Sequence, residues 1–315
     1  MGVVTLDAFG LMVGLEKKDA FEGWFSKVDA KEAGILFSVI WGYTTHEKTK
    51  HAFLQFTSSL DHDTAYISYP IEEMWVEENP FVLHIGNNIL SKEKMVLDFV
   101  MDGKNVKGSF RFEELSPIRT SFLKPGIMGW LTHFPNECNH GIISMNHEVS
   151  GNLTVGEDSF LISGAKGYME KDWGISFPEN YVWAQANDFE DSSIAFSYAS
   201  VPMLGKSAKG FFLVLHHEGK EYRFSSIEGS FMLDFKVRED AFVAVIQKGR
   251  YKVVLKAKQL NPVALASPDH GEMRAKIKES LDGRMALLLF KGKEKIMELQ
   301  TERGSIDVDF GEKAD

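Results

Sequence analysis

Short runs of alternating or wholly apolar residues recur along almost the whole 315-residue sequence, and this pattern constrains the fold most strongly. Each run is bounded by Gly, Pro, Asn or Asp, and no segment of convincing length has helical periodicity. Such spacing is typical of antiparallel sheets in sandwiches or barrels. The runs are 21–28, 35–43, 51–57, 64–69, 81–85, 94–100, 106–112, 141–149, 159–169, 181–189, 193–201, 210–217, 231–237, 241–247, 251–259, 285–290, 295–300 and 305–310.

The breaks between runs carry turn signals. Glu218-Gly219-Lys220, Lys248-Gly249-Arg250 and Lys291-Gly292-Lys293 each place a glycine where a hairpin tip is expected. The chain also has 24 Phe and 27 Gly, a pairing that favours tightly turned β-structure over helical bundles. We therefore expect an all-β protein.

Residues 113–140 interrupt the strand pattern. Pro117, Pro125 and Pro135 fall within this stretch, among scattered apolar residues. A chain of this length suggests about two domains. We therefore expect an N-terminal β domain over residues 1–125 and a C-terminal β domain over 126–315, with the boundary inside 113–140.

Charge and composition exclude several classes of protein. The chain carries 35 Lys+Arg against 45 Asp+Glu and has no dense basic cluster, which argues against a nucleic-acid partner. No apolar run is long enough to span a membrane as a helix. The N-terminus lacks signal-peptide features, and Cys138 is the only cysteine, so we expect a cytoplasmic protein.

The common catalytic and metal motifs are missing. The sequence has no glycine-rich phosphate loop, no GxSxG elbow, no HExxH and no CxxC. His216 and His217 are adjacent on an expected strand, so they point to opposite faces. His140 and His147 are seven residues apart, which also disfavours a shared metal. We expect neither a metal nor a cofactor.

Two expected strands carry polar groups in unusual places. His147 lies on an otherwise apolar face of 142–149, where a core histidine satisfied by a backbone carbonyl is the simpler reading. On 181–189, one face presents Trp183, Gln185 and Asn187 beside further aromatics. Amides between aromatics suit a lipophilic pocket that orients a ligand, although a solvent face is the alternative.

A third segment, 167–174, combines acids with aromatic residues. Extended backbone places Tyr168, Glu170 and Asp172 on one side, and neighbouring carboxylates raise each other's pKa. One of them could then hold a proton at neutral pH. An exposed turn without special chemistry is the competing interpretation, and Lys171 weakens the like-charge argument.

Several of these segments together resemble the tocopherol cyclase-like family. The resemblance is carried in order by Phe21-Glu22-Gly23-Trp24-Phe25, Ile85-Gly86-Asn87-Asn88, Glu137-Cys138, His140 to His147, and Gly167 to Gly174, followed by Ser176-Phe177-Pro178, Trp183, Gln185 and Asn187. The chain departs from the family pattern at Phe25-Ser26 and at Ala186. The matching motifs span residues 21–203.

The resemblance implies a fold and a chemistry. The fold would be two lipocalin-like, calycin-type antiparallel β-barrels. The chemistry would be cofactor-free, proton-triggered ring closure of a prenylated quinol to a chromanol. Such a site needs a proton donor, aromatic walls beside a cation, and amides that orient hydroxyl groups.

On this basis we expect Asp172 to be the acid, with Glu170, His147 or Glu22 as substitutes. The expected substrate-binding residues are Trp24, Tyr168, Trp173, Trp183, Gln185 and Asn187. The partner would be a small lipophilic molecule, that is, a prenylated quinol, a terpenoid or a lipid, and peripheral membrane contact stays open. The alternative function is a non-catalytic lipocalin-like protein that binds or transports a hydrophobic ligand, and a weaker alternative is an interaction module without a pocket.

Overall fold

The computed structural model describes residues 7–122, 124–133, 136–203 and 206–310. These residues form two compact units. The first unit comprises residues up to Phe177 together with Leu265–Ala275, and the second comprises Pro178–Ala264 and the residues from Lys276 onward. Among the described residues there is no α-helix, and the expectation of an all-β protein is confirmed.

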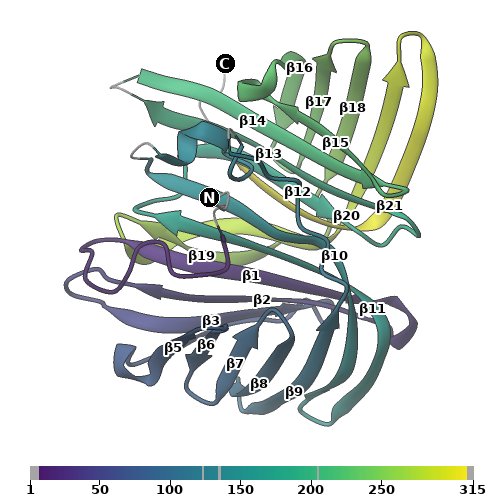
Figure 1. Cartoon of the computed structure of the whole chain (residues 1–315). Coiled ribbons are helices and arrows are strands. Elements are labelled where there is room, and N and C mark those ends of the chain that lie inside the picture. Colours follow the sequence, from purple (N-terminus) through teal and green to yellow (C-terminus); the bar gives the residue numbers. More distant parts are fainter. Residues whose placement is uncertain (1–6, 123, 134–135, 204–205, 311–315) are drawn as a thin grey trace. The chain divides into compact units, whose positions relative to one another are not determined.

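The first unit is built on one antiparallel sheet in the order β4-β3-β2-β1-β11-β10-β9-β8-β7-β6-β5 (Figure 1). Its strands are β1 (Phe21–Ala30), β2 (Ile35–Thr44), β3 (His51–Ser58), β4 (Thr64–Tyr69), β5 (Met74–Glu78), β6 (Phe81–Ile85), β7 (Asn88–Ser91), β8 (Lys94–Met101), β9 (Lys104–Glu113), β10 (Cys138–Val155) and β11 (Asp158–Gly174). Short 3₁₀ turns are η1 (Lys31–Ala33), η2 (Ile71–Glu73) and η3 (Gly129–His133).

The centre of this sheet is buried on both of its faces. β1 and β11 lie side by side, and nearly every residue of β1 is buried. Side chains alternate between the faces of a strand, so Trp24 and Val28 of β1 enter the apolar core while Phe25 and Lys27 project from the opposite face. The sheet curls round this core, which also contains large aromatics such as Phe37.

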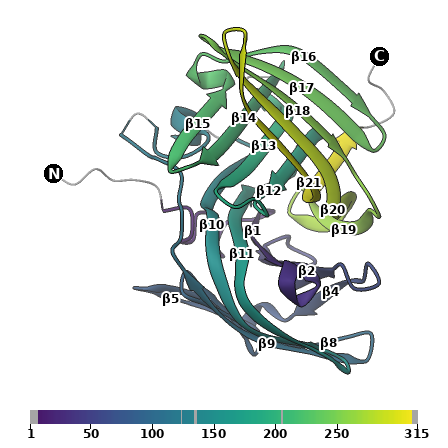
Figure 2. The ribbon, with the colours of Figure 1, turned by 90° about the vertical axis from the view of Figure 1, so that its right-hand side faces the viewer.

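The second unit has its own sheet, in the order β15-β14-β13-β12-β21-β20-β18-β17-β16, which curls round a separate core (Figure 2). Its strands are β12 (Asn180–Ala186), β13 (Ser192–Met203), β14 (Lys206–His217), β15 (Lys220–Ser225), β16 (Phe231–Arg238), β17 (Ala241–Lys248), β18 (Tyr251–Lys258), β20 (Glu272–Lys291) and β21 (Glu294–Phe310). The 3₁₀ turn η4 (Ser226–Glu228) follows β15. The tips at Gly219, Gly249 and Gly292 all have positive φ, as their turn signals predict.

One segment of the C-terminal half belongs to the first unit. β19 (Val263–Asp269) pairs with β20, and residues 265–275 contact the first sheet. The amide of Gln55 on β3 donates to the Ala266 carbonyl (3.4 Å) and accepts from the Ala266 N–H (2.9 Å). The Phe177 N–H donates to the Pro268 carbonyl at 3.1 Å. The first unit is therefore discontinuous in sequence.

The division between the units differs from the expected boundary within 113–140. β10 and β11, which follow that stretch, pair with β9 and β1 in the first sheet, and the chain leaves the first unit only after Phe177. The proline-containing stretch 113–140 connects two neighbouring strands of one sheet instead. Among the described residues, no helix is long and apolar enough to cross a membrane.

Candidate functional site

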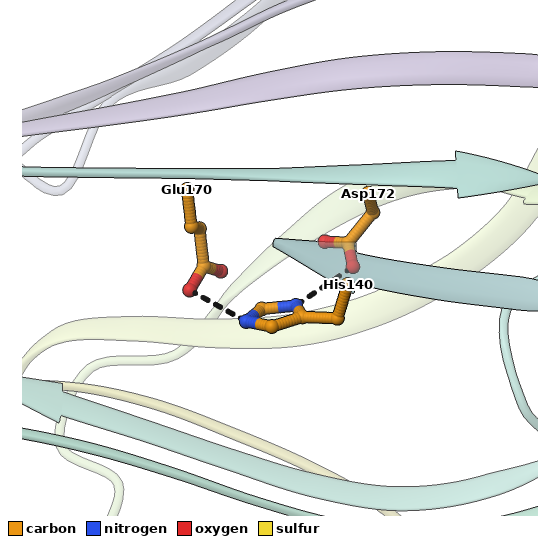
Figure 3. Close-up of side chains that lie close together, drawn as sticks. All are labelled: His140, Glu170 and Asp172. Atoms are coloured by element: carbon orange, nitrogen blue, oxygen red, sulfur yellow. Dashed lines mark hydrogen bonds and ion pairs between the residues drawn. The ribbon is translucent and has the colours of Figure 1, made fainter. Parts of the chain in front are cut away.

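A histidine lies between two carboxylates on the face of the β10–β11 pair that points away from the first core. The antiparallel register pairs His140 with Asp172 and Ile142 with Glu170. His140 Nδ1 lies 2.8 Å from Asp172 Oδ1, and its Nε2 lies 3.3 Å from Glu170 Oε2. Figure 3 shows both acidic side chains extending from β11 toward the two nitrogens of one ring. The ring therefore bridges two carboxylates.

Tyr168 completes this group of residues. Its hydroxyl donates to Glu170 Oε2, so Tyr168, Glu170 and Asp172 share one face of β11 as their spacing predicts. We call His140, Tyr168, Glu170 and Asp172 the carboxylate–histidine cluster. The Asp172 side chain is more accessible than that of Glu170, since 23% of it is exposed against 6%.

Burial and charge oppose each other at His140. Burial alone lowers the pKa of the imidazole, but the charges of Glu170 and Asp172 and their hydrogen bonds outweigh it and raise that pKa to about 10. This raised pKa favours the charged ring at neutral pH, in which Nδ1–H donates to Asp172 and Nε2 forms an ion pair with Glu170. Burial, and then the charge of Glu170, raises the pKa of Tyr168 well above its ordinary value.

Such a cluster can store and transfer protons. The 2.8 Å hydrogen bond between His140 Nδ1 and Asp172 Oδ1 is short enough for a proton to pass between the ring and the carboxyl group. His140, Glu170 and Asp172 also offer one ligand atom each within 4.8 Å of one another, which is the geometry of a possible metal site. A metal bound there would displace the proton of one ring nitrogen of His140, since a histidine ligand binds through a free lone pair.

A second polar group lies on the opposite face of β11, inside the first unit. Lys171 Nζ lies 2.5 Å from Glu22 Oε1, and both side chains are fully buried. The Lys171 ammonium sits 4.2 Å from the ring centre of Trp24 and 5.6 Å from that of Trp173. Burial lowers the pKa of Lys171 to about 8, although the charge of Glu22 acts against that shift. We call these four residues the interior ion pair and its tryptophans.

The N-terminal residues bind to this interior group through their backbone. The Met12 and Val13 N–H groups donate to Glu22 at 2.5 and 3.2 Å, and Lys171 donates to the Gly10 carbonyl. The Trp24 indole donates to the Phe9 carbonyl at 2.8 Å. Tyr43 also donates to Glu22. All of these contacts lie inside the first unit. Glu22, Trp24 and Trp173 are therefore on the opposite face of the sheet from the carboxylate–histidine cluster.

His147 lies apart from both groups. It is 3% exposed, its Nδ1 lies 3.2 Å from Ser144 Oγ, and its ring packs edge-on against Phe112 at 4.9 Å. Burial lowers its pKa to about 4. Gly167 makes room for the ring, since a Cβ there would stand 2.1 Å from His147 Nε2. This environment is that of a neutral core histidine.

Trp183, Gln185 and Asn187 belong to the second unit. Val182, Ala184 and Ala186 of β12 enter the second core, so Trp183 and Gln185 project from the other face, as the alternation predicts. Both amides are fully buried, and Gln185 and Trp183 pair in register with Ser305 and Asp307 of β21. A buried polar strip therefore runs along this face of the second sheet.

The structure thus groups the expected site residues into separate sets. One set is the carboxylate–histidine cluster, which contains Tyr168, Glu170 and Asp172. Another is the interior ion pair and its tryptophans, which contains Glu22, Trp24 and Trp173. Sequence reasoning missed His140 as a member of the site. Its pairing with Asp172 depends on the register of β10, which is displaced by irregularities on either side of Ser144. The only signal in the sequence was the position of His140 within the motif that runs to His147.

Comparisons with known proteins agree with this architecture. The sequence pattern of a family described as tocopherol cyclase-like matches residues 119–310. A rice (Oryza sativa subsp. japonica) protein named probable tocopherol cyclase, chloroplastic, is 31% identical over 117 residues, and the maize (Zea mays) tocopherol cyclase, chloroplastic, is 30% identical over 113. Each match covers 34% of this chain and only 24% of the relative.

Two crystal structures share the fold at low sequence identity. A candidate AttH protein from Nitrosomonas europaea aligns with a TM-score of 0.55 and 9% identity over 96% of this chain and 95% of its own. Kievitone hydratase from Nectria haematococca aligns with a TM-score of 0.53 and 11% identity over 98% of this chain and 96% of its own. The likeness extends over both units.

Proposed function

This chain belongs to the tocopherol cyclase-like family, and from that premise we propose that it is a cofactor-free cyclase that closes a chromanol-type ring on a prenylated quinol or a similar lipophilic substrate. The observation that carries the proposal is the carboxylate–histidine cluster, in which a charged imidazole bridges two acids and the more accessible acid is Asp172. By reaction class such an enzyme is an isomerase, because substrate and product have the same mass.

The proposed reaction uses Asp172 as the acid. The Asp172 carboxyl takes a proton from the charged His140 ring across their hydrogen bond and transfers it to the less substituted carbon of a trisubstituted alkene, which leaves a tertiary cation on the neighbouring carbon. A phenol oxygen of the same molecule attacks that cation and closes the ring, and the phenolic proton returns through the Asp172 carboxylate to His140. No proton is consumed overall. His140 holds the Asp172 carboxyl in place and stabilises its charged form.

Glu170 and Tyr168 support this arrangement. Glu170 accepts from the Tyr168 hydroxyl and faces His140 Nε2, so it fixes the ring from the far side. Trp24 and Trp173 are not part of the proposed site, because they lie with Lys171 on the other face of β11. In the second unit, Trp183, Gln185 and Asn187 belong to a separate buried polar strip, and their expected contact with a substrate is not used in the proposed reaction.

The test is conversion of short-chain prenylated hydroquinones, followed by mass spectrometry. We expect the wild type to give an isomer of unchanged mass and Asp172→Asn to lose about 10²–10⁴-fold of the turnover, the usual contribution of a general acid. Asp98→Asn is the matched control, because Asp98 forms an exposed ion pair with Lys107 elsewhere in the first unit. It should leave turnover unchanged. If the wild type and Asp172→Asn both retained a hydrophobic ligand and neither converted it, the proposed enzyme activity would be contradicted and a binding protein would be the better interpretation.

A further inference from the structure

The connection between β9 and β10 exposes two large aromatic side chains on an anchored backbone. Phe122 is 77% exposed and Trp130, on η3, is 51% exposed. In the same connection Ile118 and Ile127 are 5% and 2% exposed, so they fix the segment to the first unit. Single exposed apolar residues are ordinary on protein surfaces, but two largely exposed aromatics on one anchored segment are suited to contact with an apolar partner.

A tight turn presents Phe122. Ser121 and Lys124 exchange both of their backbone hydrogen bonds, each 2.9 Å long. Phe122 follows Ser121 in this turn, and its side chain is largely in solvent. A closed turn of this kind holds an aromatic side chain outward at little further cost in conformational entropy. We call residues 117–122 and 124–132 the docking segment.

The charge of this region is opposite to that of the whole chain. The chain has 45 acidic residues and a net charge of −10, yet the sequence between Glu114 and Glu137 contains no Asp or Glu. Arg119 and Lys124 flank Phe122, and both are exposed. The docking segment is therefore a stretch with exposed cationic and aromatic side chains on an acidic protein.

We propose that the docking segment binds the surface of a lipid bilayer that contains anionic headgroups. Aromatic side chains favour the interface between headgroups and acyl chains, and nearby cations are attracted to anionic lipids. The inference rests on the proposed function in one respect, since a lipophilic substrate would be dissolved in such a bilayer. The segment leads directly into β10, which carries His140.

Co-sedimentation with vesicles of phosphatidylcholine and phosphatidylglycerol (70:30), without any substrate, tests the proposal. We expect the wild type to bind, and Phe122→Ser to weaken binding about tenfold, as the loss of one buried aromatic side chain predicts. The double variant Arg119→Gln/Lys124→Gln should also weaken binding about tenfold, and high salt should remove this difference.

Two matched controls lie elsewhere in the first unit. Leu161→Ser removes an exposed apolar side chain (83% exposed) from β11, and Lys107→Gln/Arg111→Gln removes two exposed cations from β9. Both should bind vesicles like the wild type. Thermal unfolding of each variant verifies that it is folded. Because Phe122 is exposed, its replacement should leave the unfolding midpoint unchanged.

A second measurement reports on the depth of insertion. Vesicles with brominated acyl chains should quench part of the tryptophan emission of the wild type, and Trp130→Phe should lose most of that quenching while it still sediments. Absence of wild-type binding, or equal weakening by the control variants, would overturn the proposal and leave the docking segment as a surface for a protein partner. Turnover measured in detergent is independent of this outcome, so failure of the docking proposal and failure of the cyclase proposal can be told apart.

Discussion

At the scale of single residues, His140 couples the candidate site to pH. Its pKa is about 10 in the folded protein and about 6.5 when the chain is unfolded. The protonated ring therefore stabilises the fold fully below pH 6.5, and this stabilisation is lost as pH rises toward 10. We expect the unfolding free energy, measured in urea, to fall over this window by up to about 1.4 kcal/mol per pH unit from this one proton.

The contribution of His140 can be isolated with variants. His140→Gln should flatten the pH dependence between 6.5 and 10, whereas His46→Gln, in the turn after β2, should keep the wild-type slope. Asp172→Asn should lower the pKa of His140, which imidazole NMR resonances report directly, because one of the two flanking charges is gone. A His140 resonance that titrates near pH 6.5 in the wild type would contradict the assignment of a charged ring.

The interior ion pair makes a different residue-scale prediction. Lys171→Met leaves the Glu22 carboxylate buried without its cation, which should destabilise the protein by about 3–5 kcal/mol in chemical denaturation. Glu22→Gln/Lys171→Met removes both charges and should recover part of that loss. Lys104→Met breaks an exposed ion pair with Asp63 and should cost less than about 1 kcal/mol. If Lys171→Met and Lys104→Met lowered the free energy of unfolding equally, burial of the Glu22–Lys171 pair would have no energetic consequence.

At the scale of elements, the close packing of β10 on β11 depends on Gly167. A methyl group at this position would meet the buried ring of His147, so Gly167→Ala should destabilise the protein by about 1–3 kcal/mol. Gly167→Ala/His147→Ala should be less destabilised than the sum of the single changes, which a double-mutant cycle measures. Gly210→Ala on β14, where the nearest atom is 3.9 Å away, is the control and should change stability little. Additive effects would mean that the two residues do not contact each other.

Strand alternation predicted most elements of the fold, because hydrophobic periodicity is a local property. The strands that it missed are short or interrupted, such as β5 with its adjacent glutamates and β19 with Pro268. β20 and β21 are longer than their expected runs because Gly283 and Gly304 interrupt the alternation. The two glycines face each other, and a side chain on either one would clash with its neighbours.

The candidate site was predictable only where it lies on one strand. The spacing of Tyr168, Glu170 and Asp172 follows directly from the period of two of a β-strand. The addition of His140 requires the pairing of two strands, and the irregularities of β10 near Ser144 shift that register in a way that alternation does not reveal. Local patterns therefore identified the acids but not the cation between them.

At the scale of the whole molecule, the first unit is assembled from distant parts of the chain. Residues 265–275 are separated from Phe177 by most of the second unit, yet they satisfy polar groups of the first one. Ala266 pairs with Gln55, Gly271 accepts from Thr44, and the Gly271 N–H donates to the Ile175 carbonyl at 2.7 Å. A cut after Phe177 therefore leaves buried donors and acceptors without partners.

We accordingly expect the fragment 7–177 to be less stable than the first unit of the intact chain, and a synthetic peptide of residues 263–277 to raise its unfolding midpoint. In the intact chain, Gln55→Ala should cost about 1–3 kcal/mol, because the Ala266 N–H loses its acceptor, and should speed hydrogen exchange at that amide. Gln247→Ala, whose amide bonds only within an exposed turn of the second unit, should have no such effect. If the fragment unfolded at the same denaturant concentration with and without the peptide, residues 265–275 would contribute nothing to the first unit. The stability of residues up to Phe177 would then not depend on this distant segment, which the hydrogen bonds of Ala266 and Gly271 argue against.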